Sequence, residues 1–268
     1  MNVIRHDGRT VNQIRPIFIH YDVYGYADAS VLFEQGNTKI LVSVSLQPGV
    51  PHFLKGKRTG WLSAEYAMLP HATHQRTTRE TSQAQRNARS VEISRLIGRC
   101  LRPTVDLDAL GERSIFVDCD VLQADGGTRV ASLTAASLAL KLACTRWVEQ
   151  RLVASNIFKV QLAALSTGMI DGIAYADLSY AEDSQADADF NFVLTEHDEL
   201  IEVQGTSEKK PMRWEFFDQL KILAVHGVKE IFKKTATLSH RLPNPEPTSY
   251  LKDQNKPALF SLGQRLNK

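Results

Sequence analysis

The acidic segment EDSQADADFN, at residues 182–191, contains the side chains best suited to bind a cation. Asp183 and Asp189 lie in an irregular stretch that leads into a short apolar run. Magnesium in proteins is typically held by one or two carboxylates, by water and by substrate phosphate oxygens. Because the segment contains no Cys or His, Mg²⁺ or Mn²⁺ is favoured over zinc. The alternative is an acidic surface loop that binds nothing.

A glycine turn, QADGGTR at residues 123–129, lies between an expected strand and an expected helix. Gly127 allows close approach of the backbone to a ligand, and the free N–H groups of Thr128 and the rest of a helix start carry partial positive charge. Arg129 adds a guanidinium whose N–H groups match phosphate oxygens. The turn therefore predicts an anion site, although it is neither a P-loop nor a dinucleotide fingerprint. A plain tight turn before a helix is the alternative.

Arg89 is a further candidate anion ligand. It directly precedes Ser90, which we expect to cap a helix over residues 91–101. The helix macrodipole disfavours a cation at that end. An arginine there is explained by an anion bound between it and the helix, or else by a solvated side chain. His71 and His74 lie nearby but lack the HExxH context of a metal site.

The elements that must position these residues recur twice in a similar order, strands followed by a helix. In the first half we expect a hairpin within residues 17–46, irregular structure over 50–90, a helix at 91–101, a strand at 114–122 and a helix at 130–152. In the second half we expect hairpins within 162–180 and 190–204 and a helix at 213–234. The pattern predicts an α/β (α+β) fold of two pseudo-repeated halves.

Composition and charge narrow the class of protein. The chain has 268 residues, 43% of them hydrophobic and 23% charged, as in ordinary globular proteins. The net charge of +2 disfavours binding to nucleic acid by bulk charge alone. Residues 53–102, however, carry ten Lys and Arg against three acids, and residues 176–202 carry nine acids and no Lys or Arg. Two solvated faces would explain this segregation. So would a basic surface for a polyanion beside an acidic cation site, which phosphate-ester chemistry needs.

The cysteines and the apolar runs bear on cellular location. Cys100, Cys119 and Cys144 lie in apolar segments without a CxxC pair, so we expect three buried reduced thiols. The N-terminal residues lack the apolar core of a secretory signal, and no run approaches the ~18 apolar residues of a membrane span. We therefore expect a cytoplasmic protein with no membrane partner.

The sequence resembles the ribonuclease PH family, phosphate-dependent 3′ exoribonucleases that trim tRNA precursors. The matching blocks are GNTKILVSVS at 36–45, FLKGK, GW, AEY, MLP and ATH within 53–74, EISRLIGRCLR at 92–102, LGERSIFVDCDVLQADGGTR at 110–129, EDSQADADFN at 182–191 and IEVQGT at 201–206. The resemblance implies two βαβ-type halves forming a single domain over residues 1–240, as in exosome ring subunits. It also implies a homo-hexameric ring built as a trimer of dimers. The polar tail at 241–268 lies outside the resemblance and is expected to be poorly ordered.

The resemblance also implies roles for single residues. The expected ligands of the attacking orthophosphate are Arg89, Gly127, Thr128 and Arg129. Asp183 and Asp189 match the essential aspartates that bind the metal and act as acid. Arg76 and Arg79 match family arginines implicated in holding tRNA. Arg95 and Arg99 belong to the basic stretch at 53–102, and we expect them to bind RNA as well.

The expected function is phosphorolytic trimming of 3′ extensions on tRNA precursors and other structured RNA 3′ ends. Inorganic phosphate would be the co-substrate, Mg²⁺ or Mn²⁺ the cofactor, and nucleoside 5′-diphosphates the products. The chain departs from the family pattern at His71, Ala88, Val130 and Ala136. One alternative is a catalytically inactive RNA-binding ring subunit, which the retained charged residues disfavour. Another is a phosphate-binding enzyme such as a small-molecule kinase, for which no motif is present.

Overall fold

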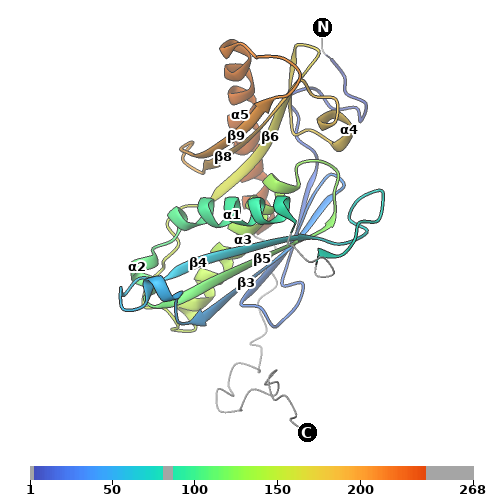
Figure 1. The fold of residues 1–268 in the computed structure, drawn as a ribbon. Coiled ribbons are helices and arrows are strands. Elements are labelled where there is room, and N and C mark those ends of the chain that lie inside the picture. Colours follow the sequence, from blue (N-terminus) through green and yellow to red (C-terminus); the bar gives the residue numbers. More distant parts are fainter. Residues whose placement is uncertain (1–2, 81–86, 240–268) are drawn as a thin grey trace.

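Two β-sheets with helices packed on them form the two halves of the molecule in a computed structural model that describes residues 3–80 and 87–239 (Figure 1). The tail expected at 241–268 lies outside the described residues. The first sheet has the order β1-β2-β3-β5-β4, with bounds Ile17–Tyr21, Ala29–Gln35, Thr38–Pro48, Arg113–Gln123 and Trp61–Met68. The second has the order β7-β6-β8-β9, with bounds Ile173–Ala176, Leu162–Ile170, Ala188–Thr195 and Leu200–Ser207. The predicted fold class is confirmed.

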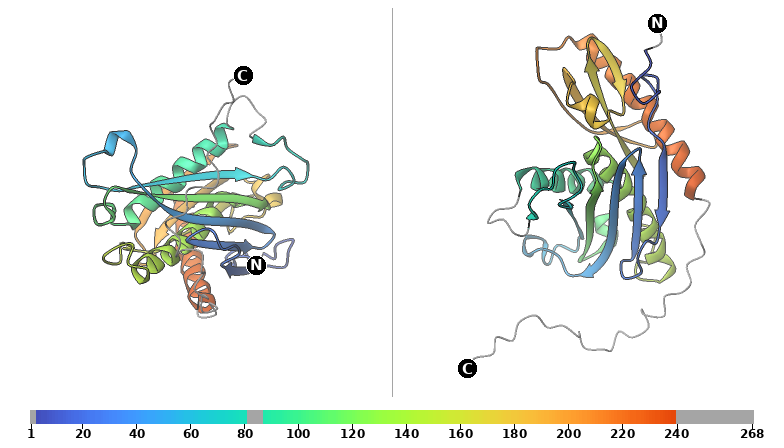
Figure 2. Two further views of the ribbon diagram at one scale, coloured as in Figure 1. Left: turned by 90° about the horizontal axis from the view of Figure 1, so that it is seen from below. Right: turned by 90° about the vertical axis from the view of Figure 1, so that its right-hand side faces the viewer.

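The helices cover defined faces of these sheets (Figure 2). They are α1 (Ala88–Leu101), α2 (Leu107–Leu110), α3 (Thr128–Glu149), α4 (Tyr180–Asp183) and α5 (Trp214–Ser239), with short 3₁₀ turns at His52–Leu54 and Arg102–Thr104. Helices α1 and α3 pack on the first sheet, and α5 packs on β6, β7 and β8. None of the helices described is long and apolar enough to cross a membrane. The three cysteines are buried free thiols, as predicted.

The prediction of irregular structure over residues 50–90 is wrong in part, because β4 lies within that stretch. This strand pairs in parallel with β5, and Tyr66 lies opposite Cys119. Leu62 and Tyr66 are buried under α1, so the stretch carries the period-two alternation of a strand. The second strand of the hairpin expected within 162–180 also ends early, at Ala176, since Asp177 turns the chain with a left-handed φ of 53°.

The predicted cap of α1 is wrong as well. The helix begins at Ala88, and its N-cap is Asn87, whose Oδ1 accepts a hydrogen bond of 2.9 Å from the backbone N–H of Arg89. Ser90 lies inside the first turn, where its hydroxyl donates to the carboxylate of Glu80. Asn is as good a cap as Ser, so the helix starts at the earlier of the two candidates. Arg89 therefore lies in the first turn of α1.

Helix α3 is the common core of both halves. It packs on β2 and β3 of the first sheet and on β6 of the second, so it is apolar around most of its circumference. Beyond the reach of the short strand β7, two backbone N–H groups of β6 need other partners. Leu162 N–H donates to Ser137 Oγ and Ala164 N–H donates to Thr134 Oγ1, both at 3.0 Å. Polar side chains of α3 thus complete the edge of the second sheet.

A buried charge network joins the N-terminal segment to both halves. The Asp177 carboxylate, fully buried, accepts hydrogen bonds from the backbone N–H, Nε and Nη2 of Arg15 at 2.6, 3.0 and 2.7 Å. Nη1 of Arg15 donates to the carbonyl of Asp125 in the glycine turn. The Arg5 guanidinium pairs with Glu182, which also closes the capping box at the start of α4. The network fixes the glycine turn against the segment that carries the candidate aspartates.

Gly126 permits this close approach. Its φ is +73°, and a Cβ at this position would stand 2.6 Å from the carbonyl oxygen of Leu178 and 2.8 Å from the nitrogen of Tyr180. We predict that Gly126→Ala lowers the free energy of unfolding more than Gly172→Ala does. Gly172 has a similar φ of +77° but open space around it, so each variant suffers φ strain of about 1–3 kcal/mol. Only Gly126→Ala adds an overpacking cost of about 1–3 kcal/mol. Equal urea midpoints for the two variants would contradict the close approach.

Asp177→Asn should destabilise the protein by about 3–5 kcal/mol at neutral pH, because it leaves Arg15 buried without its counter-charge. The exposed-pair control Asp218→Asn should cost less than about 1 kcal/mol. Burial acts to raise the pKa of Asp177, but the charge and hydrogen bonds of Arg15 outweigh it and hold the pKa below the ordinary 3.8. The stabilisation is therefore present above pH 3.8 and is lost as the pH falls through the folded-state pKa. Urea unfolding of wild type and variant from pH 7 downward should show the difference shrinking in acid.

Candidate functional site

The candidate site lies where the first turn of α3, the first turn of α1 and the segment from α4 to β8 meet. Gly127 is the N-cap of α3, with φ 65° and ψ 21°, and it provides no side chain to cap the first-turn N–H groups. Thr128 is buried, and its Oγ1 accepts a hydrogen bond of 3.0 Å from the Tyr66 hydroxyl. Because Thr128 Oγ1 accepts this bond, its own O–H can still donate, so both the hydroxyl and the backbone N–H of Thr128 are suited to an anion.

Asp183 and Asp189, the predicted metal ligands, lie within electrostatic reach of each other. Asp183 ends α4, and Asp189 lies on β8 opposite Thr206 of β9. Partial burial raises the pKa of Asp189, and the charges of Asp183 and Glu208 raise it further. Partial burial also raises the pKa of Asp183, against the opposing charges of Arg89 and Arg129. Carboxylates that repel one another in this way are typical of functional sites.

Both predicted phosphate-binding arginines lie at the same place. The positive charges of Arg89 and Arg129 reach the Asp183 carboxyl, and both also reach the Tyr66 hydroxyl. Arg89 is exposed, whereas the Arg129 side chain is only 21% exposed. Two guanidinium groups therefore act on the Asp183 carboxyl, and one of them, Arg129, lies in the first turn of α3.

Arg129 is held in place by two neighbours that the sequence did not identify as site residues. Its Nη1 donates to Oε1 of Gln204 on β9 at 2.9 Å, and its Nη2 donates to Oε2 of Glu92 on α1 at 2.8 Å. Each contact occupies one N–H group, so the others remain available to an anion. Other contributors that sequence reasoning missed are Glu208, which acts on both aspartates, and Arg15. Gln204 lies in the IEVQGT block at 201–206, and the resemblance of that block to the family could have pointed to this residue.

The donor set fits a hard divalent cation better than zinc. Within residues 3–80 and 87–239 there is no group of three or more His, Cys, Asp or Glu side chains arranged to hold a metal. Magnesium needs only one or two carboxylates when substrate phosphates and water complete its shell. The mutual repulsion between Asp183 and Asp189 is the kind that a bound cation relieves. That Asp183 and Asp189 hold Mg²⁺ or Mn²⁺ stays a prediction.

The predicted RNA-binding arginines have different surroundings. Arg76 and Arg79 are exposed on the loop after β4. That loop runs beside the site, since Ala124 N–H donates to the Ala72 carbonyl at 2.8 Å and the rings of His74 and Tyr180 lie 6.0 Å apart. Arg95 is exposed on α1. Arg99 pairs with Glu202 of β9, with Nε to Oε2 at 2.8 Å, so much of its charge is neutralised.

Three of the departures from the family pattern, at Ala88, Val130 and Ala136, leave the charged groups of the site in place, whereas His71 stands where the family usually has an arginine. Ala88 is the exposed first residue of α1, and His71 is exposed on the neighbouring loop. Val130 and Ala136 are fully buried in α3. These two residues therefore act in packing and have no side-chain atom that could bind an anion.

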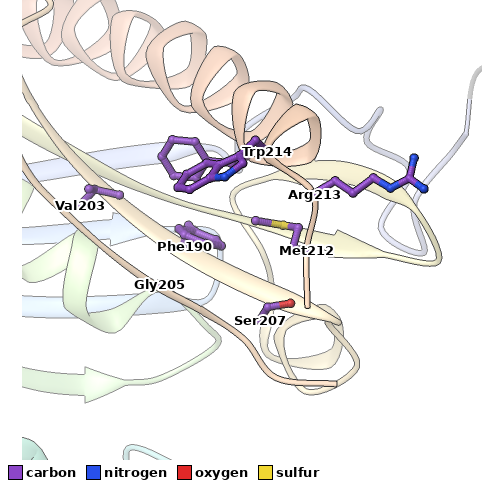
Figure 3. Close-up of a pocket in the computed structure, with 8 residues that line it drawn as sticks. Phe190, Val203, Gly205, Ser207, Met212, Arg213 and Trp214 are labelled. Carbon is purple, nitrogen blue, oxygen red and sulfur yellow. The ribbon is translucent and has the colours of Figure 1, made fainter. Parts of the chain in front are cut away.

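A cavity of about 420 Å³ lies elsewhere, between β8, β9 and the start of α5 (Figure 3). Phe190, Met212 and Trp214 line it, and Arg213 points outward. Successive residues of a strand face opposite sides of the sheet. Phe190 therefore faces the cavity and the neighbouring Asp189 faces the candidate site. The cavity is not part of that site.

Comparison with known proteins agrees with this arrangement. Models of the 3′ exoribonuclease family match the chain over residues 13–145 (domain 1) and 161–221 (domain 2). Three similar solved structures share the fold. A chain of the Archaeoglobus fulgidus exosome with RNA bound to the active site has a TM-score of 0.73 and 22% identity, covering 86% of this chain and 92% of that one. A chain of an archaeal exosome core has a TM-score of 0.70 and 22% identity, covering 87% and 91%. Rice (Oryza sativa) Rrp46 has a TM-score of 0.68 and 20% identity, covering 87% and 99%. The family matches span most of the chain, and the protein belongs to the ribonuclease PH family of 3′ exoribonucleases.

Proposed function

We propose that this protein is an active phosphate-dependent nucleotidyltransferase that removes nucleotides from the 3′ ends of tRNA precursors and other structured RNAs. One observation carries the proposal: two guanidinium groups and the uncapped start of α3 lie within electrostatic reach of two mutually repelling carboxylates. Phosphoryl transfer depends mainly on positioning and on neutralising charge, and needs little covalent help from side chains. A site with both signs of charge fits that requirement.

In the proposed reaction an oxygen of inorganic phosphate attacks the phosphorus of the 3′-terminal phosphodiester. The new P–O bond forms as the bond to the 3′ oxygen of the preceding nucleotide breaks, and a nucleoside 5′-diphosphate leaves. Attack of one anion on another is electrostatically opposed. Arg89, Arg129 and the N–H groups that start α3 would hold the attacking phosphate in line and offset its charge.

Asp183 and Asp189 would act on the other side of the scissile bond. The leaving 3′ oxygen must gain a proton on release, and a carboxyl whose pKa is raised is better suited to donate one than a carboxyl at its ordinary pKa. The same pair would hold Mg²⁺ or Mn²⁺, which when bound offsets charge on the phosphate oxygens. Reversal of the reaction adds a nucleotide to an RNA 3′ end.

Assembly and location belong to the same proposal. The structures that resemble this chain come from exosomes and related proteins, which supports a ring. We infer a homo-hexamer built as a trimer of dimers, acting in the cytoplasm.

The competing function is an RNA-binding ring subunit without activity. A product assay separates the two: purified protein, Mg²⁺ and a tRNA with extra 3′ nucleotides, with and without orthophosphate. Phosphate-dependent nucleoside diphosphates are expected, whereas RNA binding without product would establish the competing function.

Arg129→Ala should raise the KM for phosphate by about 10–100-fold, since a charged hydrogen bond to an anion is worth about 1.5–3 kcal/mol. The KM for RNA should change far less. Lys233→Ala, an exposed cation on α5, is the matched control and should leave both constants unchanged. Steady-state rates of diphosphate release at varied phosphate measure the effect. An unchanged phosphate KM would remove Arg129 from the anion site.

Asp189→Asn should lower kcat by about 10²–10⁴-fold while changing the phosphate KM little, because the carboxyl acts on the departing group and not on the nucleophile. The amide keeps the size of the side chain, so folding is preserved. Single-turnover rates at saturating phosphate isolate the chemical step. A variant with wild-type turnover would show that Asp189 has no part in the reaction.

RNA affinity should fall steeply with salt if arginines contact the phosphate backbone. Arg79→Ala should weaken tRNA binding and reduce the log–log salt slope by about 1. Arg99→Ala should reduce the slope less, because Glu202 already neutralises Arg99. Filter binding in a KCl series provides the slopes. Equal losses of slope in the two variants would show that the Arg99–Glu202 pair opens on RNA.

A further inference from the structure

A continuous chain of hydrogen bonds runs from Arg99 on α1 to Arg129 in the candidate phosphate site. Arg99 donates to Glu202, the Nε2 of Gln204 donates to Oε1 of Glu202 at 2.9 Å, and the Oε1 of Gln204 accepts from Arg129 at 2.9 Å. We propose that Gln204 is the positioning residue that aims Arg129 at the attacking phosphate, and that Glu202 and Arg99 fix Gln204. This inference rests on the proposed function and assigns a role to residues outside the phosphate ligands.

The two neighbours of Gln204 determine the orientation of its amide. Glu202 can only accept hydrogen bonds and the Arg129 guanidinium can only donate them. A flipped amide would point its NH₂ group at the guanidinium and its oxygen at the carboxylate, so both contacts would be lost. Only one orientation satisfies both partners, and it directs the carbonyl oxygen at Nη1 of Arg129.

Glu202 is a firm support for Gln204. Its side chain is 16% exposed, and it accepts from Arg99 and from the Cys100 thiol, at 3.4 Å, as well as from Gln204. Burial acts to raise the pKa of Glu202, but the hydrogen bonds from Arg99 and Cys100 outweigh it and keep the pKa below its ordinary value. The carboxylate therefore stays charged and acceptor-only at neutral pH.

The strand register places Gln204 correctly for this role. Gln204 lies opposite Asn191 and Asp189 lies opposite Thr206, so Gln204 and Asp189 project from the same face of the β8–β9 pair. Gln204, which orients Arg129, and Asp189, which acts on the leaving group, therefore project from the same pair of hydrogen-bonded strands. A shift of the ladder would move both together, which preserves the distance between them.

Gln204 suits this position better than a second carboxylate would. The other partner of Arg129, Glu92, is 44% exposed and negatively charged, so it forms a weak, salt-screened pair and competes with phosphate for the guanidinium. The amide of Gln204 orients Arg129 without neutralising it. Gln204 therefore does not reduce the positive charge that Arg129 offers to the anion.

The test is the affinity for orthophosphate itself, measured by isothermal titration calorimetry on the full chain, together with phosphate KM and kcat. Gln204→Ala should weaken phosphate binding about 10-fold, and kcat at saturating phosphate should stay within about 2-fold. Gln219→Ala, which removes an exposed amide from α5, is the matched control and should bind phosphate as wild type does. Circular dichroism melts confirm that each variant is folded.

A double-mutant cycle separates positioning from a general structural effect. If Gln204 acts through Arg129, then Gln204→Ala should add no further loss in an Arg129→Ala background. Arg99→Ala should weaken phosphate binding about 3-fold alone and have no effect in a Gln204→Ala background. An unchanged phosphate affinity in Gln204→Ala, or losses that add in the double variants, would overturn the inference.

The outcomes also distinguish this inference from the proposed function. Wild-type protein that binds phosphate but releases no nucleoside diphosphate would overturn the proposed activity, and the binding cycle would still decide the role of Gln204. Wild-type protein that binds no phosphate would overturn both.

Discussion

The ion pair between Arg15 and Asp177 is the constraint on which the arrangement of the site depends. It is buried, it uses three hydrogen bonds, and its guanidinium also reaches the carbonyl of Asp125. A buried charge pair contributes little net stability over an apolar replacement, yet losing one partner is costly. Its effect is therefore to exclude other arrangements of the glycine turn relative to α4. The start of α3 and the segment with Asp183 can then lie close together.

Opposite charges are separated within this frame. The arginines border the helix start, and the carboxylates lie on α4 and β8. The charges of Arg89 and Arg129 act to lower the pKa of Asp183. Among the described residues, nevertheless, no ion pair joins the two sets, because Arg129 is engaged by Gln204 and Glu92. The protein thereby maintains unfavourable electrostatics in the absence of ligands. Such preorganised charge is what an enzyme needs to stabilise a transition state without reorganising at the moment of reaction.

Most of the fold and the charged part of the site could be predicted from the sequence. Hydrophobic periodicity identified α3 and β5, and the chemistry of anion and cation ligands made Arg129 and Asp189 candidate ligands, whose roles stay predictions. Strand β4 was missed because its alternation is short and lies among loop residues, and its partner β5 is remote in sequence. The cap at Asn87 was missed because two good capping residues lie close together. The roles of Arg15 and Gln204 depend on tertiary contacts, which no local pattern encodes.

The Arg15–Asp177 pair also has a consequence for how the protein is made. Its two residues are 162 positions apart in the chain, so the pair forms only after the first half and strands β6 and β7 of the second half have left the ribosome. Helix α3 emerges earlier, with an apolar surface that awaits β6. The first half is thus exposed to chaperones and to aggregation during synthesis. Contacts between residues so far apart in the sequence slow folding. A nascent chain that ends before Asp177 cannot form the pair and has no assembled site.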